Sequence, residues 1–155
     1  MQQIFFFDNE LEYISEGAFL GLPSLQELAL YGGRLTTIPP NTFATLGNLR
    51  FFDASANQLE VIDSRWFVNN TSVFQLNFNR NLIHSIHTSL VDMPMLTNLQ
   101  LLQNICIDAV FLINDQTREQ VRTELRPCLD NYPSRITRFI MELEGDLSLF
   151  DGNGT

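Results

Sequence analysis

The sequence is short of positive charge. Its 155 residues include nine Lys and Arg against eighteen Asp and Glu, which gives a formal net charge of −9 and a pI near 4.5. The nine cations do not cluster, so the chain lacks the basic patch that nucleic-acid binding requires. We therefore expect no nucleic-acid partner and attribute the acidity to solubility.

Long hydrophobic runs are missing as well. No apolar stretch approaches the roughly 18–20 residues of a membrane helix, so the sequence predicts no membrane span in this chain. The first seven residues, M-Q-Q-I-F-F-F, lack the basic region, the long apolar region and the small-residue cleavage site of a signal peptide. They are interpreted as a strand.

Motifs for catalysis and for metal or cofactor binding are also absent. There is no Gly-rich phosphate loop, nucleophile elbow or H-E-x-x-H, and the acidic residues are scattered rather than paired. Cys106 and Cys128 have no nearby His and fall short of the four ligands of a structural zinc site. His84 and His87 lack a third ligand, and a solvated turn is the better interpretation. We expect no enzyme activity, no metal and no cofactor.

What the sequence does contain is a 24-residue repeat over residues 1–105. Units that begin at Met1, Leu25, Leu49 and Val73 align by residue type, as four units of 23–24 residues and the start of a fifth. The common pattern is L-x-x-L-x-L-x-x-N-x-L-x-x-I-x-x-x-x-F, which resembles the extracellular type of leucine-rich repeat. The resemblance implies an α/β solenoid: a horseshoe segment with short parallel strands on its concave face and a C-terminal helical cap.

One column of the repeat is polar. Asn9, Asn57, Asn81 and Asn104 follow the expected strands, and Gly33 takes this place in the second unit. Because a side-chain amide both donates and accepts, we expect stacked Asn residues to satisfy the backbone of neighbouring coils. At Gly33 we expect either a looser coil or a backbone that is satisfied in another way.

The first unit is expected to expose its apolar edge. Solenoids end in caps with polar outer faces, but Ile4, Phe6, Leu11 and Ile14 have no unit in front of them. Either upstream sequence is missing from this chain or a partner covers the edge, and we favour missing sequence.

A polar-faced helix is expected after the repeats. Val121 and Leu125 are spaced i, i+4 within residues 115–126, and Pro127 is expected to end the helix. Such a helix would seal the open core at the end of the solenoid.

Residues 106–130 resemble the C-terminal cysteine cap of secreted leucine-rich repeat proteins. The resemblance implies a disulfide between Cys106 and Cys128, although such caps commonly carry four cysteines and this one has two. Two unrelated buried thiols are the alternative. The junction N-I-C-I-D at residues 104–108 narrows the resemblance to secreted leucine-rich repeat proteins of insects, some of them immune factors that pair through coiled coils.

Glycosylation triplets support an extracellular location. The sequence Asn69-Asn70-Thr71-Ser72 contains two overlapping sites, and residues 153–155 form a third. The two preceding units carry Leu where Asn70 stands, so we expect a turned-out bulge with a glycan on Asn69 or Asn70. A looser coil without a glycan is the alternative. We expect a secreted protein or an ectodomain fragment.

Residues 131–155 form the last expected segment. Apolar residues spaced 4, 3, 4 and 3 apart over residues 136–150 predict an amphipathic helix, followed by a disordered tail. This helix either packs on its own domain or makes homo- or hetero-oligomers through its apolar seam.

Function is expected on the concave face, formed by outward residues of the successive strands. Exposed aromatic side chains are common binding hot spots, and amides suit polar protein or glycan surfaces. The predicted binding residues are Phe5, Phe7, Glu27, Tyr31, Phe51, Asp53, Gln75, Asn77, Asn79, Asn98 and Gln100.

Two functions from different classes remain open at this point. With the family resemblance, the face predicts an extracellular module that binds a protein or a microbial or glycan ligand, including a role in innate immunity. The alternative is a structural protein that assembles through its exposed first coil and its C-terminal helix.

Overall fold

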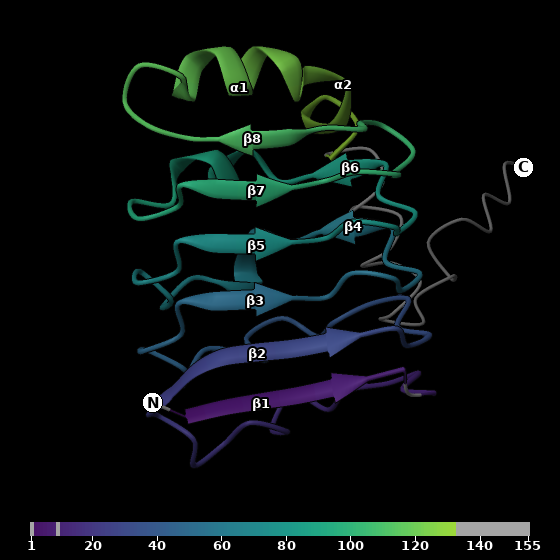
Figure 1. Ribbon diagram of the computed structural model, residues 1–155, viewed down its shortest axis with the longest axis vertical. Helices are drawn as coiled ribbons and strands as arrows, with labels where there is room; N and C mark the ends of the chain where they lie inside the picture. Colours follow the sequence, from purple (N-terminus) through teal and green to yellow (C-terminus); the bar gives the residue numbers. More distant parts are fainter. Residues whose placement is uncertain (1, 9, 133–155) are drawn as a thin grey trace, which may run out of the picture.

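The computed structural model describes residues 2–8 and 10–132, which wind into a solenoid of stacked coils (Figure 1). One six-stranded sheet runs along it in the order β1-β2-β3-β5-β7-β8. Its first five strands are parallel, and β8 is antiparallel to β7. The bounds are β1 Gln2–Phe7, β2 Leu25–Tyr31, β3 Phe51–Asp53, β5 Gln75–Asn77, β7 Asn98–Gln100 and β8 Val110–Leu112. The predicted solenoid is confirmed.

Period-two alternation explains each strand. The central residues Leu28, Phe52, Leu76 and Leu99 are paired in register and fully buried. Their neighbours on either side point away from the core, as alternation along a strand requires. Each unit therefore places a buried side chain at the centre of its strand, and stacking of the units builds the core.

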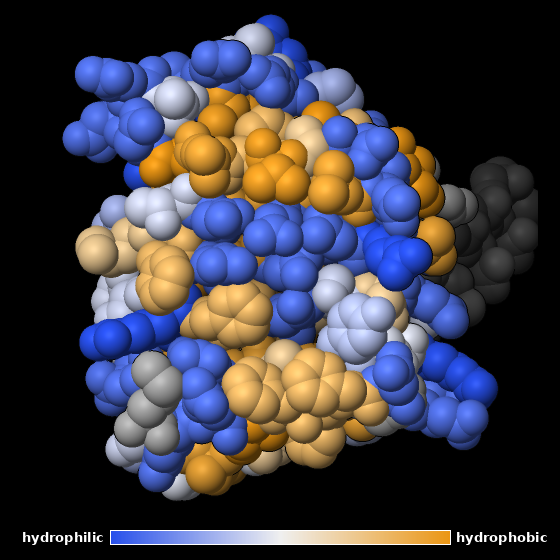
Figure 2. Space-filling view, viewed as in Figure 1, coloured by the Kyte–Doolittle hydropathy of each residue, from blue (hydrophilic) through white to orange (hydrophobic). Residues whose placement is uncertain are grey.

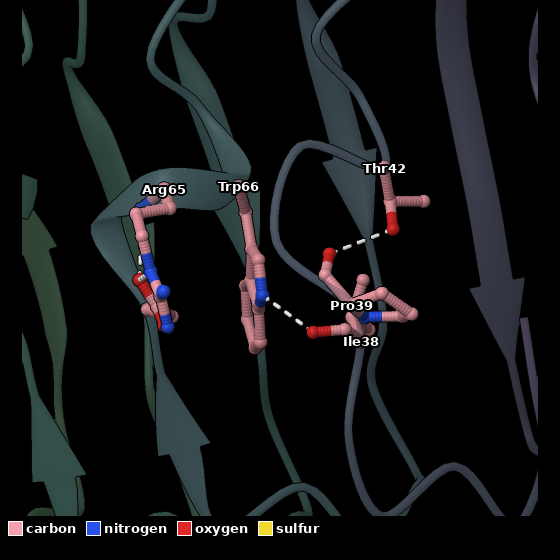
Figure 3. Close-up of polar contacts among 6 residues, drawn as sticks. Ile38, Pro39, Thr42, Arg65 and Trp66 are labelled. Carbon is pink, nitrogen blue, oxygen red and sulfur yellow. Dashed lines mark hydrogen bonds and ion pairs between the residues drawn. The ribbon is translucent and has the colours of Figure 1, made fainter. Parts of the chain in front are cut away.

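The opposite side of the coils is packed with aromatic rings. Phe43 lies between Phe19 and Phe67: its ring is tilted against Phe19, with centroids 5.8 Å apart, and stacks on Phe67, with centroids 5.7 Å apart. A two-stranded sheet, β4 (Val61–Ile62) and β6 (Ser85–Ile86), and two 3₁₀ turns, η1 (Ser64–Trp66) and η2 (Thr88–Asp92), complete this side. The indole Nε1–H of Trp66 donates to the Ile38 carbonyl at 2.8 Å and joins adjacent coils (Figure 3).

The predicted Asn ladder is present at Asn57, Asn81 and Asn104. In each case the amide oxygen accepts from a backbone N–H of the preceding coil, at 3.0–3.1 Å. The amide nitrogen donates to carbonyls of its own coil and of the preceding coil. These side chains therefore replace the hydrogen bonds that the turn after each strand leaves open.

A second recurrent feature lies one residue before this column. Asp8, Gly32, Ala56, Arg80 and Gln103 all have positive φ, between 43° and 72°. Only one of the five is glycine. A Cβ at Gly32 would lie 2.7 Å from Oδ1 of Asp8 and 3.1 Å from its backbone, so this coil requires glycine there.

At Gly33 the coil is not loosened at its contact with the coil before it. The N–H of Arg34 donates to the Leu11 carbonyl at 2.8 Å, and the equivalent bond from Gln58 to Leu35 is equally long. Arg34 also forms exposed ion pairs with Glu10 and Glu12. The contact with the preceding coil is therefore kept although the Asn is missing, and the looser coil, the first of our two expectations, is not observed at this contact.

The C-terminal end is closed by α1 (Arg118–Glu124) and α2 (Arg126–Leu129), which lie above β8 in Figure 1. Cys106 and Cys128 form a disulfide with Cα atoms 5.4 Å apart. The predicted core contacts of Val121 and Leu125 are confirmed by their burial.

Two local expectations for this cap are wrong. The helix begins at Arg118 rather than at residue 115, and Pro127 does not stop helical structure. It lies in the first turn of α2, where a missing N–H leaves no hydrogen bond unmade.

The first coil is less open than expected. Ile14 is buried, and Ile4 and Leu11 pack partly against the core, whereas Phe6 is exposed. The amphipathic helix predicted over residues 136–150 and the predicted tail lie outside the described residues.

Candidate functional site on the concave face

The sheet brings the predicted binding residues together on the face turned away from the core, which we call the concave face. Strand pairing aligns Gln3, Glu27, Phe51, Gln75 and Asn98 in one row across the sheet. A second row contains Phe5, Ala29, Asp53, Asn77, Gln100 and Val110. Figure 2 shows this face divided into zones of different polarity.

The zone over β1 to β3 is aromatic and consists of Phe5, Phe7, Tyr31 and Phe51, which we call the aromatic patch. The rings of Phe5 and Phe7 stack at 5.6 Å, and Phe7 meets Tyr31 edge-on at 6.4 Å. Phe5 is 42% and Phe7 61% exposed, while Tyr31 and Phe51 are half-buried. Large exposed aromatic surface of this kind is favourable only where something covers it.

The middle zone is a polar strip made by Asp53, Asn77, Asn79 and Gln100, the blue band in Figure 2. Asn77 Nδ2 donates to Asp53 Oδ2 at 2.9 Å, and Asn79 Nδ2 donates to Gln100 Oε1 at 3.0 Å. The strip is therefore already bonded to itself across three strands. A ligand would meet fixed donors and acceptors rather than mobile amides.

A third zone is aliphatic, and its residues on β8, Val110 and Leu112, were not predicted from the sequence. Leu102, Val110 and Leu112 expose 40%, 44% and 69% of their surface beside the polar strip. The signal was available: Val110 and Leu112 alternate with the buried Phe111 and Ile113, which is strand periodicity. The 24-residue repeat ends before β8, so the repeat register does not place this antiparallel strand on the face.

The remaining predicted residues differ in their surroundings. Glu27 and Gln75 are half-buried and have no side-chain hydrogen bond within the described part of the chain. Asn98 has a buried Oδ1 without a partner among the described residues. None of the outward positions of the described strands carries Lys or Arg, so the charge of this face comes from carboxylates.

The two overlapping glycosylation triplets lie away from this face, and the expected bulge at Asn70 is wrong. Asn70 is 0% exposed, and its Nδ2 donates to the carbonyls of Phe43 and Leu46 at 3.0 and 2.7 Å. A glycan on this nitrogen would break both bonds and could not fit the core. Asn69 is exposed.

The side opposite the concave face holds the most perturbed ionisable groups. Burial, and then the nearby Asp63, raise the pKa of Tyr132 above its ordinary value. A side-chain hydrogen bond to Asp63 raises the pKa of Arg65. The Tyr132 ring also meets His87 edge-on at 4.5 Å, so these groups attach the end of the cap to the convex side.

Other possible sites are less developed. A hollow of about 280 Å³ between two coils is lined mostly by apolar and neutral side chains, among them Phe67, Leu90 and Met93. Within residues 2–8 and 10–132 no group of three or more His, Cys, Asp or Glu is placed to hold a metal ion. In the same part of the chain, no helix has the length and apolar character to span a membrane.

Comparison with known proteins agrees with this geometry. The family model described as Leucine rich repeat matches residues 7–59 and 55–104. Proteins of this family typically act as binding scaffolds rather than as enzymes. The search of curated proteins gave no match.

Solved structures share the fold. The APL1 leucine-rich repeat domain is 26% identical with a TM-score of 0.63, over 67% of this chain and 27% of that one. Toll in the glycosylated Drosophila Toll–Spatzle complex is 28% identical with a TM-score of 0.60, over 63% and 13%. TLR13 from a complex with ssRNA13, at 24% identity, 78% and 16% coverage and a TM-score of 0.59, supports the fold alone.

The chain thus spans about a quarter or less of the length of these structures. Its repeated strands, its Asn ladder and the family model, which covers well over half of its residues, agree with one another. The chain belongs to the leucine-rich repeat family.

Proposed function

We propose that this chain is an extracellular recognition module that binds a protein ligand on its concave face. The observation that carries the proposal is the exposed aromatic patch beside a polar strip whose hydrogen bonds are already made. Aromatic anchors next to ordered polar groups are the composition of protein-binding hot spots. A protein surface offers both the area and the polar groups to cover these zones together.

The structural relatives support recognition as the general role. The Toll structure is a complex with Spatzle, described as a hub in Drosophila development and innate immunity. By analogy, we propose an immune or developmental protein ligand for this chain, with a glycan ligand as the second candidate.

An extracellular location is part of the proposal. The disulfide between Cys106 and Cys128 suits an oxidising compartment. We propose Asn69 as the glycan acceptor of the overlapping pair, because it is exposed while Asn70 is buried. After expression through a secretory pathway, Asn69→Gln should abolish the mass shift on deglycosylation at this site. An unchanged shift would refute the assignment.

The binding function can be tested by screening the chain against an array of secreted proteins and glycans. The affinity of each ligand found in this way is then measured for the wild-type chain and for the double variant Phe51→Ser, Tyr31→Ser. Two half-buried aromatic anchors at about 1 kcal/mol or more each predict a loss of affinity of about 30-fold. The matched control is Tyr13→Ser, Leu20→Ser, two exposed residues of the connection between β1 and β2.

The two variants separate the outcomes. Loss in the face variant with retention in the control supports the proposal. Equal affinity of the face variant and the wild-type chain would refute it. The assembly function stays an alternative for residues 136–150, and a mass shift only on deletion of residues 134–155 would favour it.

A further inference from the structure

The outward residue at the centre of the aromatic patch is the small Ala29. On its own strand it lies between Glu27 and Tyr31, and strand pairing places Phe5 and Asp53 on either side of it. Neighbouring strands are about 4.8 Å apart, and alternate residues of one strand about 6.7 Å apart. Two aromatic residues and two acidic residues therefore occupy the four outward positions nearest to Ala29.

The side chains around Ala29 close over it and form one mixed surface of rings and carboxylates. Ala29 is only 3% exposed, because larger neighbours cover its methyl group. Phe51 lies diagonally beside it, since Phe51 pairs with Glu27 in the adjacent row. The ring of Phe5 is held by its stack on Phe7, which in turn contacts Tyr31. These rings therefore support one another on this surface.

The charge of this site is not balanced by the protein. Glu27 makes no ion pair within the described residues, and Asp53 is held by Asn77 and Ser55, which are neutral. Arg34, on the same coil as β2, is paired with Glu10 and Glu12 instead. Two negative charges thus remain beside ring faces that are themselves electron-rich, and both features attract a cation.

We propose that this site receives an arginine side chain of the protein ligand. The inference rests on the proposed function and gives the ligand a chemical feature. A guanidinium can lie flat on an aromatic ring while its N–H groups donate to carboxylates, which a compact ammonium cannot do in one position. Asp53 keeps one open acceptor site, on Oδ2, beyond the three hydrogen bonds that it accepts from Ser55 and Asn77.

The probes are two short peptides, acetyl-Leu-Arg-Leu-amide and its citrulline analogue, which has nearly the same shape and no charge. Each is titrated into the ¹⁵N-labelled chain and followed by NMR. We expect the arginine peptide to shift amide signals of β1, β2 and β3. We expect the citrulline peptide to bind at least fivefold more weakly.

The decisive variant is Glu27→Gln, which removes one charge from an outward position and keeps its shape. It should lower the affinity for the arginine peptide about threefold to tenfold, which is the range of one partly exposed cation contact. The affinity for the citrulline peptide should stay unchanged. Glu16→Gln, an exposed acid of the connection between β1 and β2, is the matched control and should change neither. Circular dichroism of both variants verifies folding.

Equal binding of the two peptides would overturn the inference, as would signal shifts outside β1 to β3, no effect of Glu27→Gln, or no shift at about 10 mM peptide. Any of these results leaves the proposed function intact if the array ligand still depends on Phe51 and Tyr31. Conversely, if the affinity for the array ligand does not change when Phe51 and Tyr31 are replaced, the proposed function is refuted, even where the arginine peptide binds near Ala29.

Discussion

Replacing Asn81 by Ala should destabilise the fold far more than removing an ordinary surface amide. Asn81 Oδ1 accepts from the buried N–H of Leu59 at 3.0 Å, and Nδ2 donates to Ala54 and Phe78 at 3.0 and 3.1 Å. The substitution leaves the Leu59 N–H without any partner among the described residues.

The expected loss of unfolding free energy depends on which backbone groups lose a hydrogen-bond partner. The carbonyls of Ala54 and Phe78 each keep a second Asn donor, from Asn57 and Asn104 respectively. They therefore lose one hydrogen bond each, about 0.5–1 kcal/mol, while the orphaned N–H costs about 1–3 kcal/mol. The sum is about 3 kcal/mol, a large share of the 5–15 kcal/mol that is typical of whole domains.

Urea unfolding can be followed through Trp66, the only tryptophan of the sequence, which is 2% exposed. With an m-value near 2 kcal/mol/M, a loss of 3 kcal/mol lowers the midpoint by about 1.5 M. Circular dichroism should give the same transition, because a repeat array can lose cooperativity.

The control is Asn48→Ala. Asn48 is exposed and donates one hydrogen bond to the Pro23 carbonyl at 2.8 Å. It should cost no more than about 1 kcal/mol. If Asn81→Ala costs no more than this control, the ladder is not the stabilising element that its geometry indicates.

Three further predictions concern the turn, the cap and the end of the described chain. Ala56→Gly should stabilise the fold by about 1 kcal/mol, because Ala56 is held at φ 52°, whereas the control Ala54→Gly, in the core, should destabilise it; equal melting temperatures would contradict this. Reducing the Cys106–Cys128 disulfide, at a separation of 22 residues, should lower stability by about 3 kcal/mol in thermal melts, and an unchanged melt in reductant would show that the bridge contributes nothing. Because the pKa of Tyr132 is raised in the fold, the unfolding free energy should fall as pH rises above about 10, where the unfolded tyrosine ionises first. In Tyr132→Phe that dependence should shrink, and an identical slope in urea titrations would refute the assignment.

The repeat made most of the fold predictable. Each unit carries its buried strand residue, its Asn and its Phe at fixed spacing, so the register of Glu27, Phe51 and Gln75 followed from alignment alone. The Asn ladder was predictable for the same reason. Its hydrogen bonds depend on residue type and on stacking rather than on distant parts of the chain.

Features that break the repeat were harder to predict. Asn70 takes the place of a Leu, which predicted a polar bulge. Its amide nitrogen instead donates to the carbonyls of Phe43 and Leu46, so the side chain stays buried. The polarity of a residue does not reveal such partners. Likewise Asn79 and Gln100 were predicted as ligand-binding amides, and their hydrogen bond to each other was not predicted, because the repeat pattern does not show which facing amides pair across neighbouring coils.

The reversal of direction at β8 determines where the chain can accept new length. Between β3 and β5 the parallel register and the Asn hydrogen bonds continue on both sides, and apolar residues fill the same core positions. An extra 24-residue unit inserted there would meet matching surfaces above and below. After β7 the next strand, β8, runs antiparallel, and the disulfide-linked helices of the cap follow. A unit inserted there would therefore meet a strand that runs in the wrong direction for parallel pairing. The solenoid can therefore be lengthened from within by engineering, which would add one strand to the concave face and one residue to each of its rows while leaving the C-terminal end unchanged.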